Sequence, residues 1–169
     1  MKIQTKIVAE VVVSVALAYA LNMIMMFRMP QGGSVTAVSM VPLLWLALRR
    51  GVRVGVIGGI IFGIVDMFPQ PFVVHPVQFL LDYPLAFGAL GLAGFFQRHP
   101  IGGVFSGIGG RFACHFIAGV VFFGMYAPEG MNPIVYSAIY NGSYLIVELV
   151  FSVIVMYILV KRNIIKMYL

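Results

Sequence analysis

The stretch His75-Pro-Val-Gln-Phe-Leu-Leu-Asp-Tyr-Pro-Leu-Ala-Phe-Gly-Ala-Leu-Gly-Leu-Ala-Gly94 is a long apolar run with one carboxylate, Asp82, inside it. A membrane-spanning helix needs about 20 predominantly apolar residues, and this run is long enough. An ionised side chain within a span costs at least about 2.5 kcal/mol, so such residues usually have a partner or a function. We therefore expect a membrane-spanning helix here, with Asp82 marking a site inside it.

The composition of the whole chain supports this reading. Of its 169 residues, 62% are hydrophobic and only 9% are charged, whereas soluble domains have about 25% charged residues. The single cysteine, Cys114, excludes an internal disulfide and a cysteine metal cluster. Lys2 and Lys6 precede an apolar run as in a signal peptide, but no polar mature domain follows, so we expect a retained first span. We predict an integral membrane protein of the cell membrane.

Six spans are predicted, separated by turns rich in glycine, proline and charge. They cover about Thr5–Phe27, Thr36–Leu48, Val54–Met67, Pro76–Phe96, Gly102–Tyr126 and Asn132–Val160. The second and third are short for a full crossing and are expected to be tilted, or broken near the site. The fold class is thus an all-α membrane protein, with residues 1–169 forming a single six-helix domain.

The distribution of basic residues predicts the topology. With the N-terminus inside, one basic residue, Arg28, falls in the outer loops, and the inner segments hold Lys2, Lys6, Arg49, Arg50, Arg53, Arg98, Lys161, Arg162 and Lys166. Both termini are therefore expected to be cytoplasmic. The net charge of +6 is explained by this topology better than by a nucleic-acid partner, and none is expected.

Three of the predicted helices carry polar and aromatic side chains in the outer half of the membrane, to judge from a rise of about 1.5 Å per residue. Residues spaced by four share one helical face. The side chains at this level are the four-spaced series Arg111, His115, Gly119 and Phe123, together with Asp82, Tyr136 and Asn141. They predict a ligand pocket open to the outside.

Each of these residues also has a purely structural interpretation. Asp82 could form only an ion pair with Arg111, and His115 could be an interior histidine with satisfied hydrogen bonds. Tyr136 could belong to the aromatic belt of the interface, and Asn141 could bond across helices.

Three other acidic residues are expected to have structural roles. Glu148 is a candidate partner of Arg111, Glu10 is expected to pair with a basic residue of an inner loop, and Asp66 is placed at the outer end of the third helix.

The sequence lacks a G-x-x-x-x-G-K-[ST] phosphate loop, an H-E-x-x-H motif and a G-x-S-x-G motif. No nucleophile has an obvious base beside it. The polar residues therefore predict recognition of a ligand, with no catalytic residue, no metal and no cofactor.

Dispersed motifs along nearly the whole chain resemble one family. They are Met29-Pro-Gln-Gly-Gly-Ser-Val35, Met40-Val-Pro42, Arg49-Arg-Gly51, the run from His75 to Phe87, Gly91-Leu-Ala-Gly94, His115-Phe-Ile-Ala-Gly119, Tyr126-Ala-Pro128, Gly130-Met131 and the segment from Tyr136 to Asn141. This pattern is similar to the thiamin-specific substrate-binding component of energy-coupling factor (ECF) transporters. The resemblance implies a six-helix subunit that captures thiamin from outside and assembles with a transmembrane coupling subunit and two ATPases.

The resemblance also implies roles for individual residues. The acidic ligand falls on Asp82, where glutamate is common in the family, and Phe123 stands where a ligand-stacking tryptophan is expected. The remaining implied ligands are Tyr83, Arg111, His115, Gly119, Tyr136 and Asn141. The loop with Gln31, Gly32 and Gly33 resembles the lid over the site, and the small residues Ala16 and Ala20 are expected to dock on the coupling subunit.

Thiamin suits such a pocket, since a carboxylate offsets its thiazolium cation and aromatic faces attract it. Histidine, tyrosine and asparagine side chains can bond to its aminopyrimidine. Two alternatives stay open: the same scaffold with another vitamin or a thiamin precursor, and a membrane protein of a different class whose buried ion pair is structural.

Overall fold

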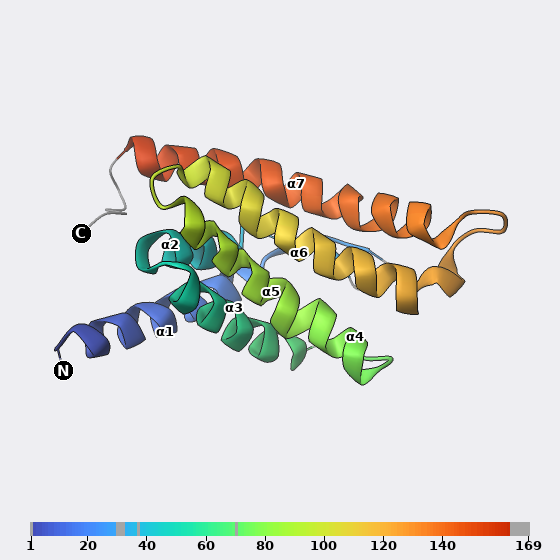
Figure 1. Cartoon of the computed structure of the whole chain (residues 1–169), viewed down its shortest axis with the longest axis horizontal. Helices are drawn as coiled ribbons and strands as arrows, with labels where there is room; N and C mark the ends of the chain where they lie inside the picture. Colours follow the sequence, from blue (N-terminus) through green and yellow to red (C-terminus); the bar gives the residue numbers. More distant parts are fainter. Residues whose placement is uncertain (1, 30–32, 37, 70, 163–169) are drawn as a thin grey trace.

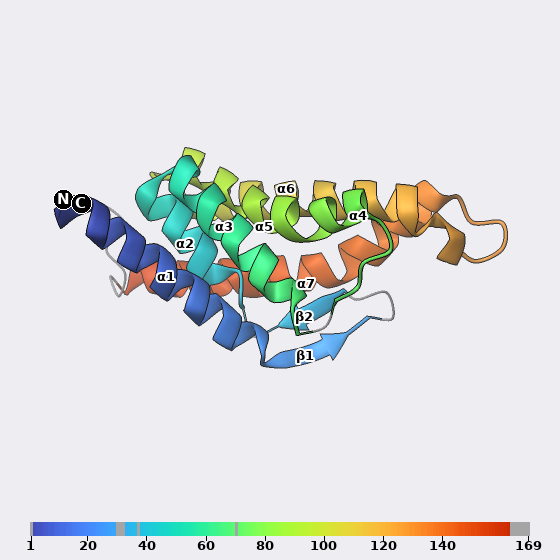
Figure 2. The ribbon, with the colours of Figure 1, turned by 90° about the horizontal axis from the view of Figure 1, so that it is seen from below.

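The computed structural model describes residues 2–29, 33–36, 38–69 and 71–162. Gln31 and Gly32 of the predicted lid loop lie outside these residues. Figure 1 shows a helical bundle in which the two long helices α6 (Pro100–Phe122) and α7 (Pro133–Lys161) run side by side, and α1 (Lys2–Asn22) lies on the opposite side. The start of α1 and the end of α7 lie at the same end of the bundle (Figure 2).

Four helical segments of the described chain are long and apolar enough to cross a membrane: Gln4–Asn22, Pro76–Phe96, Pro100–Phe122 and Pro133–Lys161. The second of these is built from α4 (Pro76–Leu80), the π-helical turn η1 (Leu81–Leu85), α5 (Ala86–Gly88) and the 3₁₀ segment η2 (Ala89–Phe96). The two other predicted spans are α2 (Val41–Arg50) and α3 (Val52–Met67), which are indeed short. A short 3₁₀ turn, η3 (Gly124–Tyr126), follows α6.

Local sequence explains where these helices begin. Proline occupies the first or second position of α2, α4, α6 and α7, where its missing N–H costs nothing. The side chain of Asn132 accepts a hydrogen bond from the Ile134 amide at 2.8 Å and caps α7. Gly51, with φ of 85°, forms the sharp turn between α2 and α3, a backbone angle that glycine adopts without steric cost.

The first predicted span was wrong at its outer end. It was expected to reach Phe27, but α1 ends at Asn22, and Met25–Arg28 form a strand, β1, that pairs antiparallel with β2 (Ser34–Thr36). Likewise α2 begins at Val41 and not at Thr36, and α6 ends at Phe122 and not at Tyr126. A short apolar run such as Met25–Phe27 has no period that separates helix from strand, and here the strand partner decides.

The inner end of the bundle is tied by an ionic cluster. The Arg50 side chain donates to Glu10 through Nε at 2.5 Å and Nη2 at 2.7 Å, and Arg49 Nε lies 3.3 Å from the same carboxylate. The predicted pairing of Glu10 with a basic residue of an inner loop is therefore confirmed, and it joins α1 to the end of α2.

Glycines bring α3 close to the helical segment that carries Asp82. Gly55, Gly59 and Gly63 are spaced by four, and a Cβ on any of them would meet another residue's backbone: that of Gly91, Phe87 and Tyr83, respectively. Small residues at this spacing let helix backbones approach closely in a membrane. The glycine face of α3 thus fixes the position of the π-helical turn.

Gly63→Ala is expected to lower stability, because the added methyl group has the rigid Tyr83 carbonyl in its place. Overpacking of this kind costs about 1–3 kcal/mol. The matched control is Gly109→Ala in α6, where nothing lies within 4 Å of the added Cβ, and helix propensity favours alanine by about 1 kcal/mol. The midpoint of thermal unfolding of both variants, measured in the same detergent, checks this prediction. Equal midpoints would contradict the close packing at Gly63.

Candidate functional site

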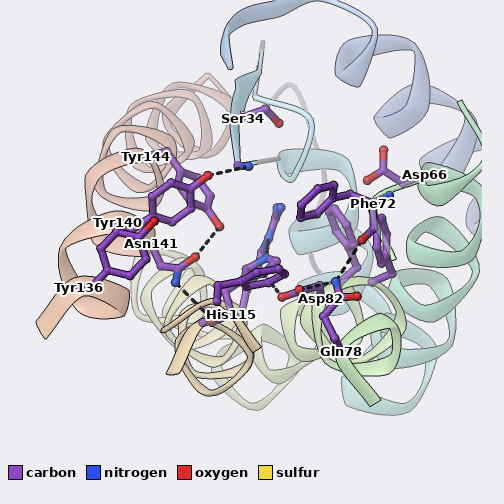
Figure 3. Close-up of a pocket in the computed structure, with 16 residues that line it drawn as sticks. Ser34, Asp66, Phe72, Gln78, Asp82, His115, Tyr136, Tyr140, Asn141 and Tyr144 are labelled. Carbon is purple, nitrogen blue, oxygen red and sulfur yellow. Dashed lines mark hydrogen bonds and ion pairs between the residues drawn. The ribbon is translucent and has the colours of Figure 1, made fainter. Parts of the chain in front are cut away.

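A pocket lies in the half of the bundle remote from the start of α1 and the end of α7. Helices α6 and α7, the segment around η1 and strand β2 converge on it (Figure 3). Its lining residues are Gly33, Ser34, Asp66, Phe72, Gln78, Asp82, Tyr83, Phe87, Arg111, His115, Gly119, Phe123, Tyr136, Tyr140, Asn141 and Tyr144. All eight residues predicted to bind substrate are therefore brought together in one cavity, with Gly33 of the predicted lid.

Asp82 is held at both carboxylate oxygens. Gln78 Nε2 donates to Oδ2 at 2.7 Å, and His115 Nδ1 lies 2.8 Å from Oδ1. Asp82 sits in the π-helical turn η1, which also contains Pro84. Proline lacks the N–H of a regular helix, and single π-helical turns frequently occur at functional sites. The local irregularity of this span thus coincides with its one carboxylate.

His115 lies between Asp82 and Arg111. Arg111 Nε donates to His115 Nε2 at 3.1 Å, and since a guanidinium can only donate, Nε2 must be the unprotonated ring nitrogen. Nδ1 then carries the proton and donates it to Asp82. The direct pair of Asp82 with Arg111, which was the structural alternative, is replaced by this relay, in which a neutral imidazole connects the two charges.

Arg111 has a second contact on its apolar side. Its Cζ atom lies 4.1 Å from the ring centroid of Phe87, within the range of a cation–π interaction. The guanidinium is therefore fixed by an imidazole and an aromatic ring, and it lines the pocket.

The α7 side of the pocket is a hydrogen-bonded set around Asn141. Its Nδ2 donates to the His115 carbonyl at 3.2 Å and to the Ser137 carbonyl at 3.0 Å, and Tyr144 donates to its Oδ1 at 3.1 Å. The bond to His115 crosses from α7 to α6, as the structural interpretation of Asn141 required. A Cβ on Gly119 would collide with Ser137 and crowd Asn141, so this glycine allows the two helices to meet here.

Aromatic rings form the remaining walls. Tyr136, Tyr140 and Tyr144 follow one another along α7, with centroids 5.9 and 6.1 Å apart. Opposite them Phe123, 9% exposed, stacks on Phe72 at 5.7 Å. The Tyr83 hydroxyl accepts a hydrogen bond from the Phe72 amide at 3.1 Å.

The hairpin formed by strands β1 and β2 covers the pocket and contacts α7. The Gly33 amide donates to the Tyr140 hydroxyl at 3.3 Å, and a Cβ on Gly33 would lie 2.7 Å from the Tyr144 ring. The buried Glu148 accepts from the Thr36 amide and, at 2.9 Å, from the Thr36 hydroxyl. Glu148 was a candidate partner of Arg111; its hydrogen-bonded partner is instead Thr36, because strand β2 packs against α7 and brings these donors to the carboxylate.

Sequence reasoning missed part of the lining. Gln78 is four residues before Asp82, and Tyr140 and Tyr144 continue the spacing of four from Tyr136, so the signal that identified the α6 face was present there too. Asp66 was placed correctly at the end of α3 but was not assigned to the pocket. Phe87 likewise follows Tyr83 by four residues, and Ser34 ends the loop that resembles the lid. Phe72 carries no local signal.

Four long apolar helices, three of which line a pocket of charged, amide and aromatic groups, define a multi-pass membrane protein with a site for a small ligand. The chain belongs to the thiamine transporter protein family (Thia_YuaJ), whose model matches residues 8–167. The predicted family, the multi-pass membrane location and the assignment to a transporter and not an enzyme are therefore confirmed.

Two curated relatives and one solved structure are similar to the chain. Thiamine transporter ThiT of Bacillus subtilis is 35% identical, covering 89% of this chain and 88% of the relative. Thiamine transporter ThiT of Lacticaseibacillus paracasei is 32% identical, covering 92% and 87%. A structure of ThiT from Listeria monocytogenes superimposes with a TM-score of 0.88 over 98% of this chain and 99% of that chain, at 23% identity. The last comparison supports the fold.

Proposed function

We propose that the chain is the high-affinity thiamin-binding subunit of an ECF-type importer and captures thiamin from outside the cell. In this proposal one six-helix domain binds the vitamin, and other subunits supply the energy. The relatives named as thiamine transporters support the ligand class, and the geometry of the pocket supports the way in which it is bound.

The observation that carries the proposal is Asp82 in its relay, facing an aromatic cavity. Thiamin has a permanently charged thiazolium ring, and a carboxylate with fixed geometry in a site of low polarity attracts a cation strongly. With a neutral His115, the ionisable groups of the pocket are Asp66, Asp82 and Arg111, one negative charge in excess. A singly charged cation would balance that charge.

The other pocket residues are assigned by their chemistry. Tyr136 and Phe123 would stack on the rings of thiamin, with phenylalanine taking the place of the family's tryptophan. Asn141 and the hydroxyl of Tyr83 would bond to the aminopyrimidine. Gly119 would leave room for the ligand, and Arg111 would act through His115.

The orientation follows from the basic residues. The cluster of Arg49 and Arg50 lies with the start of α1 at one end, and the pocket is built from the other half of the bundle. Because cytoplasmic loops carry the excess of lysine and arginine, we assign both termini to the cytoplasm, so that the pocket faces outward. The loop with Gln31, Gly32 and Gly33 would then be the lid.

The chain needs partners in this proposal, because its sequence has no phosphate loop for ATP hydrolysis. We assign hydrolysis to two ATPase subunits that act through a transmembrane coupling subunit. Ala16 and Ala20 are both exposed on α1, and their spacing would let a helix of the coupling subunit approach closely.

Calorimetric titration of the purified protein with thiamin tests the ligand. Saturable binding with a dissociation constant in the nanomolar range is expected. Parallel titrations with thiamin monophosphate and with the separate pyrimidine and thiazole precursors distinguish thiamin from its relatives. Tighter binding of a precursor would transfer the site to that ligand, and absence of binding by all of them would favour a structural ion pair.

Gln78→Met is expected to weaken thiamin binding by about ten- to a hundredfold, because one hydrogen bond to a charged group contributes about 1.5–3 kcal/mol. Gln78 is 1% exposed, and its amide is fixed by the Phe72 carbonyl at 3.2 Å and the Val74 amide at 3.1 Å. It is therefore a positioning residue that acts through Asp82. Calorimetry on this variant and on the exposed control Gln4→Met measures the effect.

A double-mutant cycle separates positioning from general destabilisation. If Gln78 acts through the carboxylate, adding Gln78→Met to Asp82→Asn should have little further effect on affinity, because coupled residues are not additive. Full additivity of the two losses would contradict the positioning role.

A further inference from the structure

Asp66 stands at an unfavourable end of its helix. It is the next-to-last residue of α3, which ends at Met67. Carbonyl groups give a helix C-terminus a partial negative charge, so a carboxylate there is disfavoured. Its side chain is half-buried. Stability of the helix therefore does not explain why this residue is acidic.

The partner of Asp66 does not neutralise it. Asn22 Nδ2 donates to Asp66 Oδ1, and Asn22 is the last residue of α1. Two helix C-termini thus meet at one carboxylate, with an amide between them. Within the described part of the chain, arginine partners at ion-pair distance are found for Glu10, and the imidazole of His115 is found for Asp82.

A second cavity adjoins Asp66 beneath the hairpin. It is lined by Asn22, Met23, Met25, Arg28, Ser34, Asp66, Pro69 and Tyr83. Three of these residues, Ser34, Asp66 and Tyr83, also line the main pocket. Figure 2 shows the hairpin beside the outer ends of α1 and α3. We call this cavity the outer chamber; it shares a wall with the main pocket, and Asp66 faces both.

We propose that the outer chamber is an encounter site for a heteroaromatic cation, which Asp66 holds before the ligand moves to Asp82. This inference rests on the proposed function and adds a second, earlier site to it. A cation leaving water would meet the Asp66 carboxylate and the two helix ends first. It would then pass Tyr83 and Ser34 to reach the main pocket.

Arg28 lines the same chamber and carries the charge opposite to that of Asp66, so it tests whether the sign of the charge determines the capture rate. It ends strand β1, and its side chain is exposed. Since water screens an exposed charge more than a half-buried one, Asp66 should dominate the field in the chamber, and Arg28 should oppose it weakly. Removing the two charges should therefore change the capture rate in opposite directions.

The test measures association and dissociation rate constants for radiolabelled thiamin by rapid filtration, at low and high ionic strength. Asp66→Asn keeps the bond to Asn22 possible and should lower the association rate constant about three- to tenfold at low salt, the lower end of electrostatic steering effects. The loss should become smaller at about 1 M salt, where charges are screened beyond about 3 Å. The dissociation rate constant should change less than twofold. Arg28→Gln should raise the association rate constant, and Asp66→Glu should restore it.

Two results would overturn the encounter site. An association rate constant unaffected by Asp66→Asn would remove Asp66 from the entry path. If Asp66→Asn raised the dissociation rate constant as much as Asp82→Asn does, Asp66 would be a counter-charge for the bound ligand and not an encounter site. Lack of saturable thiamin binding by the parent protein would overturn the proposed function together with this inference, so the two failures are distinguishable.

Discussion

Asp82→Asn is expected to weaken thiamin binding by roughly 30- to several-thousand-fold. Truncating one partner of a buried charge pair costs about 2–5 kcal/mol, and about 1.4 kcal/mol corresponds to a factor of ten in affinity. Asparagine keeps the shape of the side chain and removes the charge that would face the thiazolium cation in the proposed complex. This is the largest change in binding that we expect from a single substitution in the pocket.

The relay deepens the expected loss. In the parent protein Arg111 donates to His115, and His115 donates to Asp82. Without the carboxylate, the positive charge of Arg111 has no counter-charge at the end of the relay and faces a cationic ligand. Like charges at close range in a medium of low polarity repel strongly.

Asp82→Glu is the matched variant, because it keeps the charge and lengthens the side chain by one methylene group. It should retain most of the affinity. Calorimetric titration and thermal unfolding are needed for both variants, since a purely structural ion pair predicts poor folding with normal affinity in the surviving protein. A well-folded Asp82→Asn protein that binds thiamin as tightly as the parent would remove Asp82 from the site.

Ala16→Trp is expected to abolish assembly with the proposed coupling subunit while thiamin binding stays within about twofold of the parent value. Ala16 is exposed on α1, one helical turn before Ala20. An indole at this position would hold apart two helices whose contact depends on small side chains. Co-purification of tagged coupling subunit and ATPases with the variant measures assembly.

Ala113→Trp makes the same substitution at an exposed alanine of α6 and controls for the bulk of the indole in the membrane. It should leave assembly intact. Intact assembly with Ala16→Trp would refute the docking face, and loss of thiamin binding in the same variant would point to misfolding instead.

The chain's spans and the α6 face of the site could be read from local patterns. Apolar length predicts the four long helices, because backbone groups in lipid must be bonded within the helix. The spacing of four between Arg111, His115, Gly119 and Phe123 placed them on one face, because a helix repeats every 3.6 residues. The isolation of Asp82 in an apolar run predicts a site residue there, and Asp82 does line the pocket. These inferences depend on a few residues at a time.

The contacts between segments were decided only by the tertiary structure. Met25–Arg28 became a strand because Ser34–Thr36 lie beside it and Glu148, over a hundred residues later, accepts from Thr36. His115 lies between Asp82 and Arg111 because the π-helical turn and α6 meet at that level. Asp66 and Asn22 come from the ends of two different helices. A pairwise contact between distant segments depends on how whole helices pack, and packing is set by the summed surfaces of many residues.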